Sequence, residues 1–315
     1  MMSASAKPAL AVTPKASSML RWTTWRQRNR HAFEGWLILT PILLYYSAFF
    51  IFPVIANLYV SFTSWSGVYQ SPQWVGLTNY RIYLRDPYPL ILFNTTFFAV
   101  MILIVQTTLA FFIAVLLNEQ VVGRGLYRAL FYIPTLTSAA ITAQVFFAFI
   151  SPFDGIFNAI LKALGYPIVI WTISTFWMRF FIIIYSIWRG LGGPVVLFLA
   201  ALQGIHREVY EAAMVDGATR WAMLRYITLP LLRPMVIFVM VTGMIGSFQI
   251  FESVLLISAG GPANTTNVML LQIYYDAFVN TRLGLAAAGS IITAVVLLVF
   301  SITNMRLMSR GQVEG

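Results

Sequence analysis

The amino-acid sequence predicts an all-α integral membrane protein with six transmembrane helices and a charged cytoplasmic loop of two short helices. Hydrophobic residues make up 59% of the 315 residues and charged residues only 10%, whereas about a quarter of a soluble domain would be charged. Apolar runs recur at the roughly 20-residue length that an α-helical span requires. The net charge of +10 does not indicate nucleic acid, because the basic residues lie in short loops rather than on one polar face.

Six apolar stretches are long enough to cross a membrane. The expected spans cover residues 36–60, 90–117, 129–150, 180–203, 235–257 and 283–305. Several are interrupted by proline or glycine, a break that membrane helices tolerate where neighbouring helices satisfy the freed backbone groups. The stretches together predict a transmembrane domain over residues 34–310, between a basic N-terminal tail at 1–33 and a C-terminal tail at 311–315.

Charge asymmetry between the loops predicts how this domain is oriented. Most lysines and arginines precede the first span, follow the sixth, or lie in the loops after the second and fourth spans. Because such loops stay on the cytoplasmic side, both termini and the loop 204–234 are expected to be cytoplasmic. A cleaved signal peptide is the alternative at the N-terminus, but the first apolar run exceeds the roughly 7–15 residues of a signal-peptide core.

The cytoplasmic loop has the chemistry of two short helices that meet at a glycine. Glu208 and Glu211 fall in the first turns of the first helix, where acidic side chains suit the positive end of the helix dipole. Gly217 can adopt a left-handed conformation without steric cost and so end that helix. Pro230 fixes the entry into the fifth span, since proline is tolerated at a helix start.

From Glu208 the loop reads Glu-Val-Tyr-Glu-Ala-Ala-Met-Val-Asp-Gly-Ala, and it closes with Leu229-Pro230. This spacing resembles the EAA loop of inner-membrane (permease) subunits of binding-protein-dependent ABC importers, and most of all their carbohydrate (maltose-type) group. In that family the loop docks on a separate ATPase subunit. The resemblance implies an ATPase-coupling role for Glu208, Glu211, Ala212, Ala213, Asp216, Gly217, Leu229 and Pro230. The alternative is an ordinary cytoplasmic connector.

The resemblance covers about residues 34–310. Outside the loop it is carried by Gly76-Leu77-Thr-Asn79-Tyr80, Asn94-Thr95, Gly123-x-Gly125, Gly260-Gly261-Pro262 and Gly284-Leu285-Ala286-Ala287-Ala288. Three positions depart from the family pattern: His206 replaces a usual proline, Leu224 a usual aromatic residue, and Glu252 a usual aspartate. None of these departures removes the coupling role, although Glu252 leaves the substrate preference open.

The resemblance also implies partners. These are two ABC ATPase subunits that hold ATP and Mg, a second six-span permease subunit, an external solute-binding protein and a saccharide, assembled in the bacterial inner membrane and surrounded by lipid. No cofactor is expected in this chain itself, because none of its three lysines follows a glycine, as a phosphate-binding P-loop requires. Two histidines and no cysteine disfavour a zinc site. No catalytic constellation is evident, so the chain is not expected to be an enzyme.

Polar residues at membrane depth are costly and usually face the interior of the bundle. In the family, the corresponding stretches of the fourth and fifth spans line the translocation pathway. Carried over by position, the resemblance implies pathway roles for Ser186, Arg189, Gly190, Gly193, Gly246 and Ser247. We add Gln249 and Glu252 to the predicted pathway residues, because they are polar residues of the fifth span. The aromatic side chains of Trp188, Phe248 and Phe251 could pack against the apolar faces of sugar rings.

Two purely structural explanations are alternatives to a pathway role. The small residues in these spans could serve close helix packing instead of ligand contact. Arg189 and Glu252 could also pair with each other inside the bundle. An unpaired Arg189 would instead favour an anionic saccharide.

The stretch 268–278 is expected to form an amphipathic surface helix on the external side. Gln272, Asp276 and Asn280 would lie on its wet face. Its functional interpretation is a dock for the external solute-binding protein, and its alternative is an interfacial helix with no partner.

A secondary transporter or channel, which needs no ATPase, is the rival functional class. A proton-driven transporter requires intramembrane acids, and only Glu252 qualifies in these spans. The coupling-loop pattern therefore favours the ATP-driven importer.

Overall fold

The computed structural model describes residues 30–67, 71–119 and 123–309. Residues 1–29 of the predicted N-terminal tail and the whole predicted C-terminal tail 311–315 lie outside the described residues. The chain divides into two units, Met1–Asn57 and Leu58–Gly315. The first unit contains α2 (Arg30–Tyr46), the π-helical turn η1 (Ser47–Ile51) and the start of α3 (Phe52–Ser61).

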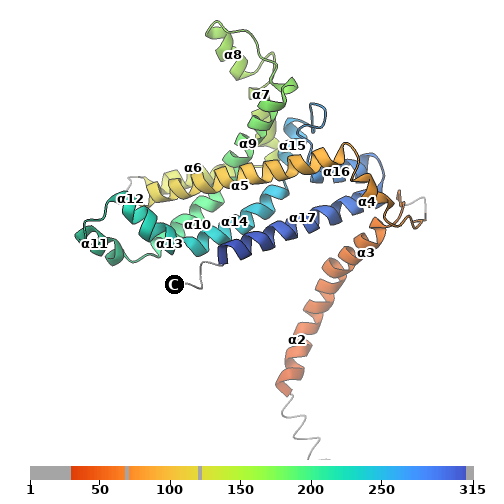
Figure 1. Cartoon of the computed structure of the whole chain (residues 1–315), viewed down its shortest axis with the longest axis horizontal. Coiled ribbons are helices and arrows are strands. Elements are labelled where there is room, and N and C mark those ends of the chain that lie inside the picture. Colours follow the sequence, from red (N-terminus) through yellow and green to blue (C-terminus); the bar gives the residue numbers. More distant parts are fainter. Residues whose placement is uncertain (1–29, 68–70, 120–122, 310–315) are drawn as a thin grey trace, which may run out of the picture. The chain divides into compact units, whose positions relative to one another are not determined.

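The second unit carries the remaining helices, of which Figure 1 labels the α-helices. Up to the break in the fourth expected span they are α4 (Thr78–Ile82), α5 (Tyr88–Asn118), α6 (Arg124–Leu136), α7 (Ala139–Phe149), α8 (Ile156–Ala163), η2 (Trp171–Ile173) and α9 (Thr175–Gly190). They continue as α10 (Gly192–Gln203), α11 (Arg207–Val215), α12 (Arg220–Met223), η3 (Leu224–Thr228), α13 (Leu229–Leu231), α14 (Arg233–Phe248), α15 (Glu252–Ile257), α16 (Met269–Tyr274), η4 (Tyr275–Val279) and α17 (Leu283–Ser309).

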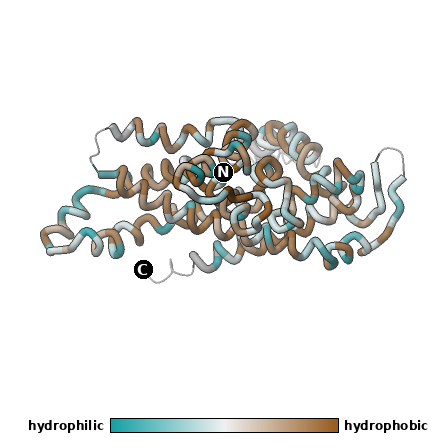
Figure 2. Tube along the Cα trace, turned by 90° about the horizontal axis from the view of Figure 1, so that it is seen from above, coloured by the Kyte–Doolittle hydropathy of each residue, from teal (hydrophilic) through white to brown (hydrophobic). Residues whose placement is uncertain are grey.

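Helix length and apolar composition agree with a membrane protein. Three helical stretches, Glu34–Ser61, Tyr88–Asn118 and Leu283–Arg306, are long and apolar enough to cross a membrane. Three further pairs qualify as bent spans: Gly125–Leu136 with Ala139–Phe149, Thr175–Gly190 with Gly192–Gln203, and Arg220–Leu231 with Arg233–Phe248. The described residues thus offer between three and six spans, and the count of six stays a prediction. Apolar colouring runs along most helices in Figure 2, and hydrophilic residues interrupt it around α11 and α12.

The core of the second unit is built around α5. This helix packs against α9, α10, α14 and α16. Ala110 and Ala114, one turn apart on α5, are fully buried beside Phe198 of α10. Such small residues let membrane helices approach closely.

Two expected spans are less regular than their apolar runs suggested. The third expected span bends by 97° between α6 and α7, where Thr137 is extended and Pro134 has no backbone N–H to donate. The fifth expected span, 235–257, is helical only to Phe248, and its remainder is the separate helix α15, which begins at Glu252. An acidic residue in the first turn of α15 suits the positive end of its dipole.

The expected surface helix 268–278 is present as α16 and η4. Asn280 is exposed as expected and Gln272 is half-buried, but the placement of Asp276 on the wet face is wrong. Asp276 is only 1% exposed, whereas Phe278 is 74% exposed. The π-helical turn Tyr275–Val279 widens the helix and shifts its phase, so a 3.6-residue period points these side chains the wrong way. The buried Asp276 carboxylate accepts a hydrogen bond from the Tyr88 hydroxyl at 3.5 Å.

Candidate functional site

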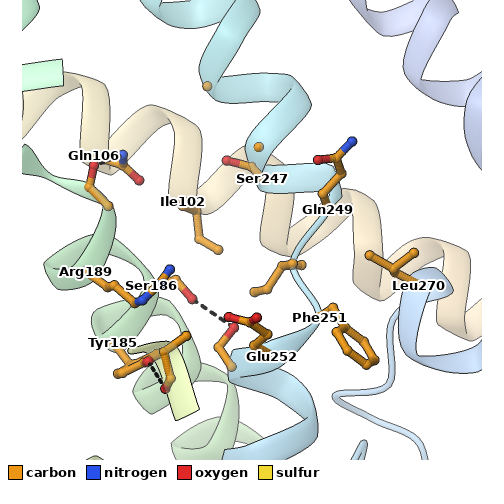
Figure 3. Close-up of a pocket in the computed structure, with 16 residues that line it drawn as sticks. Ile102, Gln106, Tyr185, Ser186, Arg189, Ser247, Gln249, Phe251, Glu252 and Leu270 are labelled. Carbon is orange, nitrogen blue, oxygen red and sulfur yellow. Dashed lines mark hydrogen bonds between the residues drawn. The ribbon is translucent and has the colours of Figure 1, made fainter. Parts of the chain in front are cut away.

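An open cavity of about 550 Å³ lies between α5, α9, α14, α15 and α16. All predicted pathway residues except Gly193 line it, together with other polar groups (Figure 3). The predicted residues in the lining are Ser186, Arg189, Gly190, Gly246, Ser247, Gln249 and Glu252. Residues chosen from two separate spans thus meet in one place, although their roles stay predictions.

Gly193, Trp188 and Phe248 are not in the lining, in contrast to expectation. Gly193 faces open space, because a Cβ added there would meet nothing within 4 Å. Trp188 is 46% exposed, and Phe248 is buried against Phe300 of α17. Of the three aromatic residues proposed for sugar contact, only Phe251 lines the cavity.

Arg189 and Glu252 enter the cavity from α9 and α15, and Figure 3 shows Ser186 between them. Within the described ranges, no ion pair joins the two side chains, so the pairing alternative is not realised. The Nε atom of Arg189 is buried and has no hydrogen-bond partner. The Ser186 hydroxyl donates to the Ser253 hydroxyl at 3.4 Å, a long and weak bond that a ligand can replace. The cavity therefore presents both a cationic donor and an anionic acceptor to a bound molecule.

Gln106 is a lining residue that the sequence interpretation missed. Its Nε2 donates to the Gly190 carbonyl at 2.7 Å and joins α5 to the C-terminal end of α9. Gly190 permits this approach, since a Cβ there would lie 3.0 Å from the same Nε2. The sequence signal that could have identified Gln106 is its amide side chain near the centre of the apolar span 90–117.

The loop 204–234 folds as two short helices joined at a glycine. α11 is followed by Gly217 in the left-handed region, at φ +78°. The hydroxyl of Thr219 then caps α12 by accepting from Ala222 N at 3.2 Å. We call Arg207–Leu231 the coupling segment; it lies at the end of the second unit remote from α15 and α16 (Figure 1).

The predicted coupling residues in and just after α11 are accessible. Glu208, Glu211, Ala212, Asp216 and Gly217 are exposed and Ala213 is half-buried. Farther along the segment, Leu229 and Pro230 are exposed as well.

The sequence interpretation missed the apolar component of this surface. At the end of α11, Val215 is 88% and Met214 55% exposed. The Glu211 carboxylate pairs with Arg207 one turn earlier at 2.9 Å, and both side chains remain open to a partner. Among the described residues, no cluster of three or more His, Asp or Glu side chains is placed to hold a metal ion.

Residues 106–310 match the family described as the binding-protein-dependent transport system inner membrane component. The match covers more than half of the chain, and it includes the coupling segment and most of the cavity lining. The chain belongs to this family. The predicted family and the all-α membrane fold are therefore confirmed, and the protein is a multi-pass permease of the inner membrane.

Curated relatives of this permease align along most of their length. It is 31% identical to the arabinooligosaccharides transport system permease protein AraP of Halalkalibacterium halodurans, over 89% of each chain. It is 32% identical to the lactose transport system permease protein LacF of Rhizobium radiobacter, over 81% of this chain and 88% of the relative. It is 31% identical to the trehalose/maltose transport system permease protein MalF of Thermococcus litoralis, over 90% and 96%.

Solved structures share the same fold. One is a bacterial ABC transporter involved in the import of the acidic polysaccharide alginate, with a TM-score of 0.79, 26% identity, and coverage of 92% of this permease and 99% of that chain. A second is the bacterial alginate ABC transporter in complex with an alginate pentasaccharide-bound periplasmic protein, with a TM-score of 0.80, 25% identity, and coverage of 92% and 98%.

Proposed function

We propose that this permease forms part of the membrane pathway of an ATP-driven importer for a sugar or oligosaccharide. The observation that carries the proposal is the gathering of polar residues from α9, α14 and α15 in one cavity of about 550 Å³. That volume is within the roughly 300–1,000 Å³ range of small-molecule sites. The guanidinium, carboxylate, amide and hydroxyl groups of the lining can hydrogen-bond sugar hydroxyls, and Phe251 offers an apolar face.

The relatives support a saccharide as cargo. Their names include arabinooligosaccharides, lactose and trehalose/maltose, and the solved relatives import alginate. The saccharide would arrive on an external solute-binding protein, as in the alginate complex. A second permease subunit of the same kind would complete the pathway.

We further propose that the coupling segment docks on an ABC ATPase subunit. Its exposed apolar residues, Met214 and Val215, lie beside the acidic residues of α11, a combination that offers a partner both burial and charge. Two ATPase subunits, which bind ATP and Mg, would move the coupling segments of the two permeases together. The coupling segment and both chain termini would then face the cytoplasm.

The test is reconstitution of the permease with its co-purified partners in proteoliposomes. Sugar-loaded binding protein is expected to stimulate ATP hydrolysis, and uptake is expected to stop without ATP. Val215→Asp should release the ATPase subunit, because it places a charge in the proposed contact. Asp154→Asn, an exposed change on the predicted opposite side, is the control. Uptake that proceeds without ATP and follows an ion gradient would favour the secondary transporter.

A further inference from the structure

The loop between α15 and α16, residues 258–268, has an unusual backbone. Ala259, Ala263 and Asn264 have φ values of +48°, +45° and +60°, and Gly260 has a φ of +85°. Non-glycine residues rarely adopt this region. They persist there only when the surrounding structure imposes the conformation.

Side chains from α5 hold this loop in place. The Asn94 Nδ2 donates to the carbonyls of Asn264 at 2.9 Å and Asn267 at 3.1 Å. The neighbouring Thr95 hydroxyl accepts from Met269 N at 2.8 Å, where α16 begins. The Asn94-Thr95 motif of the sequence thus has a structural purpose, which is to bind the loop and the helix that follows it.

A single arginine of α9 completes the attachment. Arg179 donates from Nε to the Thr265 carbonyl at 3.0 Å and from Nη2 to the Asn94 Oδ1 at 2.6 Å. Its guanidinium also lies 5.2 Å from the centre of the Phe97 ring. The Thr175 hydroxyl, one turn earlier, donates to the Thr265 hydroxyl at 3.2 Å. We call Asn94, Arg179 and Thr265 the outer clamp.

Two hydrogen bonds show that the outer clamp lies beyond the cavity lining, on the side away from the coupling segment. The hydrogen bond from Arg179 to Asn94 joins α9 to α5 at the clamp. The hydrogen bond from Gln106 to Gly190 joins the same two helices beside the cavity. With a rise of 1.5 Å per residue, these two points lie about 18 Å apart along α5. From Gly190 the chain continues through α10 to the coupling segment, so the clamp is at the end of the pathway remote from it.

The clamped loop also connects two walls of the cavity. It begins after α15, which contributes Glu252 and Ser253 to the lining, and it ends at α16, which contributes Leu270. A displacement of the loop would therefore move both walls. In the clamp, the Arg179 guanidinium donates to neutral carbonyl oxygens and not to a carboxylate. Water can therefore replace these hydrogen bonds without leaving an unpaired anion.

We propose that Asn94 and Arg179 are positioning residues that keep the external end of the cavity closed, and that the outer clamp must open for a saccharide to enter. The proposal rests on the proposed import function. An importer at rest has to be closed on the external side, and loss of the clamp would favour the outward-open conformation. ATPase subunits that are coupled to this conformation would then turn over without the binding protein.

The first test compares ATP hydrolysis by the complete complex in proteoliposomes. Arg179→Gln is expected to raise the rate without binding protein by at least about threefold, since a threefold population shift requires only about 0.7 kcal/mol. The rate with sugar-loaded binding protein should remain within about twofold of the parent, and Arg179→Lys should lie between. Arg85→Gln, an exposed arginine on the same predicted side, should change neither rate. If Arg179→Gln leaves the unstimulated rate unchanged, or lowers both rates in parallel with thermal stability, the clamp is only a structural anchor.

The second test locks the clamp. The chain contains no cysteine, so the double variant Thr175→Cys with Thr265→Cys has its only two thiols at this contact. Oxidation should join the two cysteines and abolish ATP-driven uptake, and a reductant should restore uptake. Where the disulfide yield is low, a short bifunctional thiosulfonate can cross-link the two cysteines instead. Each single-cysteine variant under the same treatment is the control. Undiminished uptake by the fully cross-linked complex would overturn the proposal, whereas failure of the cysteine-free parent to show ATP-driven uptake would instead refute the import function.

Discussion

The hydroxyl oxygens of Tyr210 and Thr228 lie 3.0 Å apart and join the two halves of the coupling segment. Tyr210 belongs to α11, and Thr228 is the last residue of η3 and only 5% exposed. Thr228 also contacts the Met223 carbonyl at 3.3 Å. The bond joins α11 to η3 across the turn at Gly217, and we expect it to carry a displacement of α11 to η3 and α14.

Tyr210→Phe should therefore loosen coupling while leaving the fold intact. The lost hydrogen bond is worth about 0.5–1.5 kcal/mol, because Thr228 keeps the Met223 carbonyl as a partner. The number of ATP molecules hydrolysed per sugar imported should rise about two- to tenfold. Tyr166→Phe, at a tyrosine that is 63% exposed and lies outside the coupling segment, provides the matched control, and an equal effect of both changes would rule out the cross-turn bond as the cause.

Gly217→Ala should weaken retention of the ATPase subunit. With φ at +78°, alanine at this position costs about 1–2 kcal/mol. A Cβ there would meet nothing within 4 Å, so the cost is in the backbone and not in a clash. ATPase retained per permease after detergent purification measures the effect. Gly125→Ala also has open space and has no positive φ; comparable loss in both variants would contradict the argument.

The elements that sequence could predict are those with a local chemical signal. Polar residues such as Ser186, Arg189 and Glu252 stand out in apolar spans because their burial in lipid is costly. Gly217 stands out because it follows a short charged helix, where a left-handed residue is needed. Together with the family resemblance, these signals identified seven of the sixteen residues that line the cavity, and they identified the turn of the coupling segment.

The features that sequence could not predict depend on tertiary contacts. The apolar residues up to Phe248 do not show that α14 ends there, since the break depends on the packing of α15 against α7 and α9. Asp276 looked solvent-exposed because a π-helical turn is not visible in a 3.6-residue pattern. No local signal in the sequence assigns Arg179 a role, because its partners on α5 and in the loop 258–268 are 85 or more residues away in sequence.

Adjacent glycines at the break between α9 and α10 should respond differently to alanine. A Cβ on Gly192 would lie 2.6 Å from the Phe131 carbonyl oxygen and 2.8 Å from Tyr132 Cα. Gly192→Ala must therefore push α6 away, and overpacking of this kind costs about 1–3 kcal/mol. Gly193→Ala has open space and should be neutral or slightly stabilising, given the helix propensity of alanine. The melting temperature of the complex in detergent compares them, and similar values would show that α6 and α10 are not in close contact.

The charges in the cavity should determine which saccharides are imported. The Arg189 guanidinium lines the cavity and, in the part of the chain that the structure describes, is not paired with Glu252, so a uronic acid carboxylate can form charge-assisted hydrogen bonds with it, each worth about 1.5–3 kcal/mol. Arg189→Ala should lower uptake of uronic oligosaccharides about tenfold or more and of neutral ones much less. Glu252→Gln should shift the preference the other way, because it removes a carboxylate that repels an anionic sugar. Gln249→Ala, a neutral change in the same lining, should affect both classes alike. Competitive uptake of a neutral and a uronic oligosaccharide of equal length measures the ratio, and equal loss of both in Arg189→Ala would mean that the guanidinium stabilises the cavity without reading the charge of its cargo.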